Sequence, residues 1–165
     1  MKTGIILLLA TLLACSGVAF AGDAVQVQRV IGYAENAEVR QAVVDECELQ
    51  TKIPVFLSKY AKKDVALVDG ELAAEGRRLE LVISNAFASG GGAWSGAKSV
   101  TVKGKLYEGE ALVGDFIARR YSTGGMFGGF KGTCSIVGRC GKAIAKDIAE
   151  WLKNPTEGAR LGDAK

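Results

Sequence analysis

Cysteine is the residue type in this chain whose chemistry depends most on the compartment in which the protein folds. The sequence has four: Cys15, Cys47, Cys134 and Cys140. Disulfides form in oxidising compartments and are rare in the cytosol. Cys140 falls within an apolar helical stripe, so we expect it to be a small buried hydrophobic residue. Cys47 and Cys134 each precede a predicted helix, and we predict that they form a disulfide, with a Cys134–Cys140 bridge as the alternative.

The sequence contains no histidine, which excludes several common kinds of catalytic and metal site. Ser-His-Asp triads, Cys-His nucleophiles and His-ligated metal centres all require it. The few cysteines include no C-x-x-C pair, so neither a metal site nor a redox motif is expected. The net charge of +3, without a basic run, is too balanced for a nucleic-acid binder. We therefore predict no catalytic residue set, no metal, no cofactor and no nucleic-acid partner.

Two aspartates are the remaining candidates for acid–base chemistry. Asp147 falls inside the apolar stripe of the last predicted helix, where an unpaired carboxylate would be costly. Arg119 and Arg120, on a strand expected beneath that helix, are its candidate partners in a buried ionic anchor. Glycosidase-type hydrolysis needs two facing carboxyl groups, and no single element carries such a pair. A hydrolase that uses Asp115 or Asp147 is therefore the least favoured hypothesis.

The spacing of apolar residues predicts the elements that must position these side chains. Alternation predicts strands at residues 25–33, 65–68, 79–87, 100–107 and 111–121, the last two joined by a hairpin at Glu108-Gly109-Glu110. Helical spacing predicts a short helix within residues 36–48. A second helix is predicted to run from a Thr51 cap to Lys62, and a third from a Thr133 or Ser135 cap to about Lys153.

These elements predict an α+β fold, with an antiparallel sheet of about five strands and two helical regions packed on one face. The core belongs to a single domain over residues 22–153. Residues 154–165 are polar and lack apolar periodicity, so we expect a flexible C-terminal tail.

Residues 1–21 have the parts of a signal peptide. Lys2 supplies the positive charge, residues 5–13 the apolar run, and Ala19-Phe20-Ala21 the small-x-small cleavage pattern. The apolar run is shorter than the roughly 20 residues that span a bilayer. We therefore expect an exported, periplasmic protein. The alternative is a membrane-anchored lipoprotein, because Leu12-Leu13-Ala14-Cys15 resembles a lipobox and makes Cys15 a candidate for lipidation.

A Gly-rich segment at residues 124–132 is a candidate partner surface. It carries Met126, Phe127 and Phe130, and it lacks the Gly-Lys-Ser/Thr ending of a phosphate-binding loop. Apolar side chains on such a loop contact a partner or a membrane surface, unless the loop folds back and buries them.

Three segments resemble small exported proteobacterial proteins of the domain-of-unknown-function type: residues 92–99 (GAWSGAKS), 129–136 (GFKGTCSI) and 146–152 (KDIAEWL). The resemblance implies an envelope location and a compact α+β domain, and it transfers no catalytic residue.

The sequence predicts a non-enzymatic cell-envelope protein that binds an envelope protein or a membrane surface, through residues 126–130 or a sheet edge. The alternative of a small-ligand or lipid-binding envelope protein would require a cavity. A deep pocket with convergent acids would favour the hydrolase, whereas an exposed apolar patch without such a pocket would favour the binding module. The oligomeric state is left open.

Overall fold

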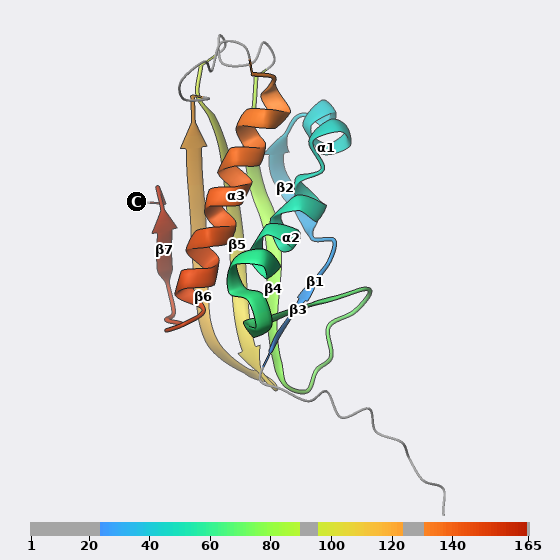
Figure 1. Ribbon diagram of the computed structural model, residues 1–165, viewed down its shortest axis with the longest axis vertical. Coiled ribbons are helices and arrows are strands. Elements are labelled where there is room, and N and C mark those ends of the chain that lie inside the picture. The colour runs from blue at the N-terminus through green and yellow to red at the C-terminus, as the bar shows by residue number, and fades with distance from the viewer. Residues whose placement is uncertain (1–23, 90–95, 124–130, 165) are drawn as a thin grey trace, which may run out of the picture.

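The computed structural model describes residues 24–89, 96–123 and 131–164. In these ranges the chain forms a sheet with helices on one of its faces (Figure 1). The strands are β1 Val25–Gln28, β2 Gly32–Val39, β3 Val65–Val68, β4 Arg77–Phe87, β5 Lys98–Glu108, β6 Ala111–Ser122 and β7 Ala159–Gly162. The helices are α1 Gln41–Cys47, α2 Leu49–Ala61, the 3-10 turn η1 Lys62–Asp64, and α3 Thr133–Trp151. Within the described ranges, no helix combines the length and apolar character needed to cross a membrane.

The sheet is larger than predicted and is mixed rather than purely antiparallel. Its order is β3-β1-β4-β5-β6-β7, and β2 also pairs with β4. The long strands β4, β5 and β6 form an antiparallel meander, whereas every pairing of β1, β2, β3 and β7 is parallel. The single strand predicted over residues 25–33 is in fact two strands. β1 pairs with β4, the chain then leaves β4, and it returns to the same edge of β4 as strand β2.

The β5–β6 hairpin confirms the turn predicted from Glu108-Gly109-Glu110. β5 ends at Glu108 and β6 begins at Ala111, so two residues make the turn. Gly109 has φ +57°, a conformation that glycine adopts without steric cost.

The helix starts differ from the predicted caps. Glu48, with φ +53°, lies between α1 and α2, so α2 begins before Thr51 and Thr51 is not its cap. α3 begins after Gly132, so neither Thr133 nor Ser135 is the capping residue. Pro54 lies within α2 and has no N–H for the carbonyl of Gln50, which instead accepts the backbone N–H of Ile31 at 3.0 Å.

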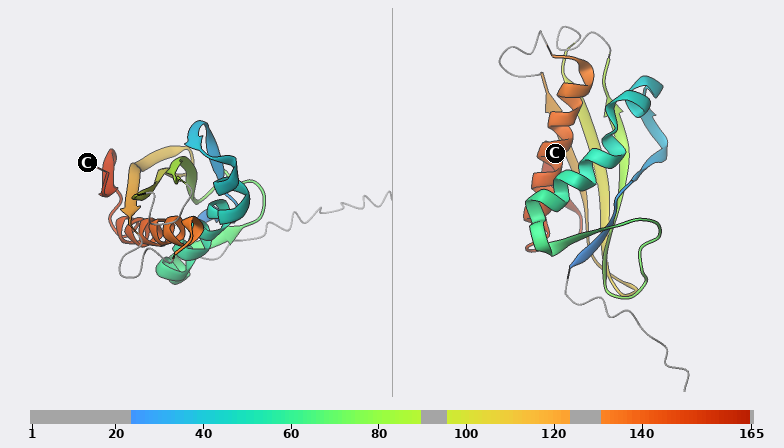
Figure 2. Two further views of the ribbon diagram at one scale, coloured as in Figure 1. Left: turned by 90° about the horizontal axis from the view of Figure 1, so that it is seen from above. Right: turned by 45° about the vertical axis from the view of Figure 1, so that its right-hand side comes forward.

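Figure 2 shows the helices lying against one face of the sheet. The core consists of the side chains that these two layers bury between them. Ile53 and Leu57 of α2, Ile144 and Ile148 of α3, and Val102 of β5 are completely buried. α2 and α3 come close at Gly141, where a Cβ would lie 3.0 Å from Ile53 Cγ1. The small residue therefore allows the two helices to pack together over the sheet.

The predicted Cys47–Cys134 disulfide is confirmed, with a Cα–Cα distance of 4.8 Å. It joins the end of α1 to the first turn of α3. Cys140 is free and buried, as expected, and burial raises the pKa of its thiol to about 11. Cys134 and Cys140 are about 9 Å apart along the axis of α3, too far for the alternative bridge.

The C-terminal segment is not the flexible tail that the sequence predicts. Residues Ala159–Gly162 form β7, which pairs with β6 in parallel. Asp163 also accepts the backbone N–H of Tyr121 at 3.2 Å. Four residues are too few to show a reliable alternation in the sequence, which is why this strand was missed.

Gly104 is a position of the sheet where a side chain is expected to be poorly tolerated. A Cβ there would lie 2.4 Å from Phe116 Cζ, and Phe116 packs edge-on against Trp151 with the ring centroids 4.8 Å apart. We predict that Gly104→Ala lowers the free energy of unfolding in urea by about 1–3 kcal/mol. Gly138→Ala, in α3, is the matched control, because nothing lies within 4 Å of its Cβ and alanine favours a helix. Equal stability of the two variants would contradict the packing at Gly104.

Candidate functional site

The face of the sheet that points away from the helices is the candidate functional surface, called the open face below. Strand residues alternate between the two faces. On β5, Val100, Val102 and Leu106 are buried under the helices, whereas Lys103 and Lys105 are exposed on the open face. Figure 2 shows α2 and α3 on the same side of the sheet.

Two rows of open-face side chains cross the sheet near one end. In the first row, Phe87 of β4 and Tyr121 of β6 both pair with Ser99 of β5. Phe87 and Tyr121 are 59% and 62% exposed, whereas Ser99 is buried. Because the serine is short, the two exposed rings stand on either side of a depression.

The neighbouring row reads Glu38, Asn85, Thr101 and Arg119 across β2, β4, β5 and β6. Together with Phe87 and Ser99, these residues line a shallow hollow of about 380 Å³. Its floor consists of short polar side chains, and its two ends carry opposite charges.

Further along the face, cations gather on the β5–β6–β7 side. Lys103 and Arg160 both pair in register with Ile117, and Lys105 lies between Glu80 and Asp115. Across the described part of the chain, no ion pair involves Lys103, Lys105, Arg119 or Arg160. This half of the open face therefore has a net positive charge, with four cations against the carboxylate of Asp115.

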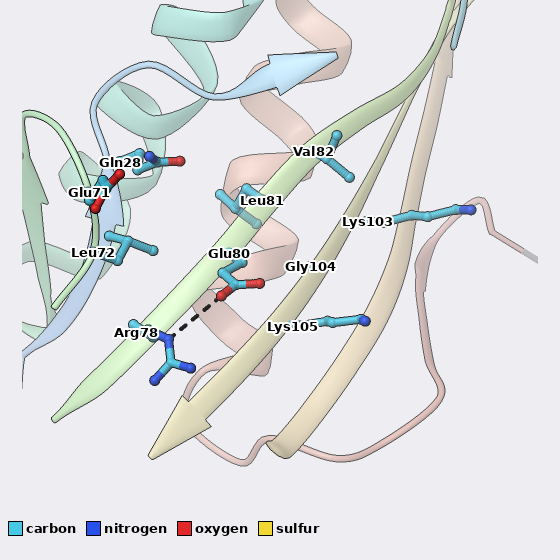
Figure 3. A pocket seen from close by; sticks show the side chains of 10 residues that line it. All are labelled: Gln28, Glu71, Leu72, Arg78, Glu80, Leu81, Val82, Lys103, Gly104 and Lys105. Carbon is cyan, nitrogen blue, oxygen red and sulfur yellow. Dashed lines mark ion pairs between the residues drawn. The ribbon is translucent and has the colours of Figure 1, made fainter. Parts of the chain in front are cut away.

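A cavity opens on the β1–β2 side, where β4 changes its partner strand. β4 pairs with β1 as far as Leu79 and with β2 from Val82, so Glu80 and Leu81 have no partner there in the described register. The cavity measures about 630 Å³. Figure 3 shows Gln28 and Leu72 across from Leu81, with Lys103 extending away from them.

Arg78 lines this cavity but is held by other parts of the chain. Its guanidinium donates to the carbonyls of Ala74 and Gly109 and pairs with Glu80 at 3.6 Å. It also lies over the Tyr107 ring, 4.4 Å from the centroid. Arg78 therefore secures the end of the meander and has few donors left for a ligand.

Asp147, one of the residues singled out in the sequence, forms a two-point ion pair with Arg120. The Nε–Oδ2 and Nη2–Oδ1 distances are 2.7 and 2.8 Å, and the hydrogen bonds raise the pKa of Arg120. Arg119 takes no part, because it projects from the open face. The Asp147 side chain is 19% exposed, so it lies on the flank of the apolar stripe rather than within the core.

The acids proposed for a hydrolase do not converge. Asp115 pairs in register with Lys105 on the open face, and it accepts the backbone N–H of Gly158 at 2.8 Å. Asp147 is on α3, on the other side of the sheet. Among residues 24–89, 96–123 and 131–164, no group of three or more acids or cysteines gathers that could hold a metal ion.

Several predicted site residues lie outside the described residues. These are the leader with Cys15, and the candidate partner residues Met126, Phe127 and Phe130. The open-face rows, by contrast, were not predicted from the sequence. The alternating polar residues of β5, Ser99, Thr101, Lys103 and Lys105, were the signal that could have revealed them.

No protein-family model and no curated protein matches this chain. Among solved structures, the crystal structure of an uncharacterised protein is similar over 79% of this chain and 91% of that chain, with a TM-score of 0.51 and 12% identity. At that identity the likeness shows a shared fold. The PelC dodecamer from Paraburkholderia phytofirmans gives a TM-score of 0.43 at 14% identity, over 76% of this chain and 86% of that chain. That likeness is too weak to bear on this protein.

The Asp147–Arg120 pair is expected to be structural. Because both side chains are partly exposed, we predict that Asp147→Asn lowers the free energy of unfolding by about 1–2 kcal/mol. Arg119→Gln, at the adjacent position on the opposite face, should change it by less than about 0.5 kcal/mol. Chemical unfolding followed by circular dichroism measures both changes. An unchanged unfolding midpoint for Asp147→Asn would contradict a stabilising role for the Asp147–Arg120 pair.

Proposed function

We propose that this protein is a non-enzymatic module of the cell envelope that binds a protein partner through the open face of its sheet. The observation that carries the proposal is the exposure of Phe87 and Tyr121, 59% and 62%, on a face that also holds cations without ion pairs. Aromatic residues and arginine are enriched at protein interfaces. A face of this composition therefore fits a protein partner.

The envelope location rests on two features that point the same way. The leader at residues 1–21 has the pattern of a signal peptide, and Cys15 offers a lipid anchor as the alternative ending. The Cys47–Cys134 disulfide is consistent with folding in an oxidising compartment. Both features support our proposal of a periplasmic location.

The separation of Asp115 and Asp147 supports a binding role over a hydrolytic one. Each carboxylate already accepts hydrogen bonds from its own chain, Asp115 from Gly158 and Asp147 from Arg120. Hydrolysis by a carboxylate pair needs the two groups on the same side of one substrate. The sheet lies between these two acids.

A small-ligand role is the second candidate, favoured by the cavity beside Leu81. Its volume of about 630 Å³ is in the range of ligand sites. However, its arginine, Arg78, is held by Glu80 and by backbone carbonyls. The open face offers more side chains that are free to bind, so we rank it first.

Position-specific photocrosslinking of the exported protein tests the open face directly. A benzophenone side chain at Lys103 of β5 should form adducts with a protein partner in intact cells. The same group at Lys146, which is exposed on α3, is the control and should form none. Mass spectrometry of the adducts identifies the partner. Adducts from Lys146 alone, or from neither position, would overturn the proposal.

A further inference from the structure

Two rows of the open face carry an acid and a cation on opposite sides of the boundary between β4 and β5. In the row through the hollow, Glu38 and Asn85 lie on one side of this boundary, and Thr101 and Arg119 on the other. In a second row, Glu80 of β4 pairs in register with Lys105 of β5. Each of these two acid–cation sets has its acid on the β4 side and its cation on the β5 side, at equal strand spacings from the boundary. Asp115, which follows Lys105 on β6, is an acid on the cationic side, and its carboxylate accepts the backbone N–H of Gly158.

A face of this kind is complementary to itself. Consider a two-fold axis that runs parallel to the strands, above the boundary between β4 and β5. It places a second copy face to face with the first, so that each row of one copy lies opposite the same row of the other. Within a row, the β4 side of one copy then faces the β5 side of the other. Glu38 then faces Arg119 of the other copy and Asn85 faces Thr101. Glu80, which also pairs with Arg78 of its own chain at 3.6 Å, faces Lys105. Sheets packed face to face are about 10 Å apart, a gap that a glutamate and an arginine side chain span together.

The same placement covers an exposed aromatic side chain. Phe87 lies opposite Ser99 of the second copy, since the two residues pair across the β4–β5 boundary. Ser99 lines the hollow together with Phe87, so the phenyl group of the second copy would lie at this hollow. Packed sheets cross at about 30°, and the matching therefore holds best for the rows nearest the crossing point.

The area of the face is close to that of a standard protein interface. β4 and β5 each have 11 residues and β6 has 12. At about 3.3 Å per residue and about 4.8 Å per strand, four strands offer about 700 Å² on each copy. A standard protein interface buries about 800 Å² per partner.

Glu38 and Arg119 do not form an ion pair with each other within a single chain. The positions are three strand spacings apart, about 14 Å, and no ion pair of the described residues includes either side chain. A membrane of anionic lipid would attract the β5–β6–β7 half but repel the half that carries Glu38, Glu71 and Glu80. A surface that carries cations opposite the acidic half and acids opposite the cationic half matches the open face better.

We propose that the partner of the open face is a second copy of this chain, bound face to face so that Glu38 of each copy pairs with Arg119 of the other. This inference rests on the proposed function, because it names the partner of the same surface.

Charge reversal with mutual rescue tests the pairing. The oxidised, exported protein should sediment as a dimer at high micromolar concentration. Glu38→Arg and Arg119→Glu, each alone, should weaken the association by roughly tenfold or more, because like charges would then face each other twice. An equimolar mixture of the two variants should form a heterodimer, and the double variant should regain the homodimer. Lys146→Glu, with the same charge change as Arg119→Glu on the helical side, should dimerise normally.

Each contrary result has a distinct meaning. A monomeric wild-type protein would overturn the inference, and so would single variants that dimerise like the wild type or a mixture that is not rescued. If the protein does not self-associate but sediments with phosphatidylglycerol vesicles, the open face binds a membrane, and the inference of a dimer is overturned as well. If the protein is monomeric but Lys103 crosslinks to a different protein, the proposed function stands and only this inference fails. Circular dichroism of every variant separates lost association from lost folding.

Discussion

The burial of α3 against β5 and β6 is the constraint from which the rest of this structure follows. Val137, Ile144 and Ile148 of α3 are completely buried, and α2 packs beside them. An alternating strand can bury only one set of its side chains under a single layer of helices. The other set, from Arg78 to Phe87 on β4 and from Ser99 to Tyr107 on β5, is left facing outward. The same packing that makes the core therefore creates the open face.

Two connections fix the ends of α3, one to α1 and the other to the sheet. At its start the Cys47–Cys134 disulfide closes a loop with a sequence separation of 87 residues, which on the entropy model contributes about 4–5 kcal/mol. Near its end the Asp147–Arg120 pair ties it to β6. Cys140 does not compete for the disulfide, because it is buried and its pKa of about 11 keeps it a thiol at neutral pH. The stability of the helical layer thus depends in part on the Cys47–Cys134 disulfide.

Local features were readable from the sequence, whereas pairings between distant segments were not. Gly109 marked the hairpin, residues 65–68 matched β3, and the less regular positions of Cys47 and Cys134 indicated the disulfide. The parallel strands were missed because their partners are remote. For example, β7 pairs with β6 across the whole of α3.

The candidate surface was missed for the same reason. Glu38, Asn85 and Arg119 come from three strands that are far apart in the sequence, and only the register of the sheet brings them into one row. Asp147 could be singled out because its position on a helix is a local property. Which of the two arginines it would meet depended on the face of β6 from which each projects, and that face is set by the pairing.

The most direct test of the central claim, that the open face is the binding surface, is the concentration dependence of the NMR spectrum of the oxidised protein. We expect signals of Val82, Thr101 and Ile117 to shift on dilution, because these residues lie on the open face. Signals of Lys146 and Ala149 on α3 should stay unchanged. Shifts confined to α3 would contradict the assignment of the open face as the binding surface. So would a spectrum that changes neither on dilution nor on addition of a binding partner.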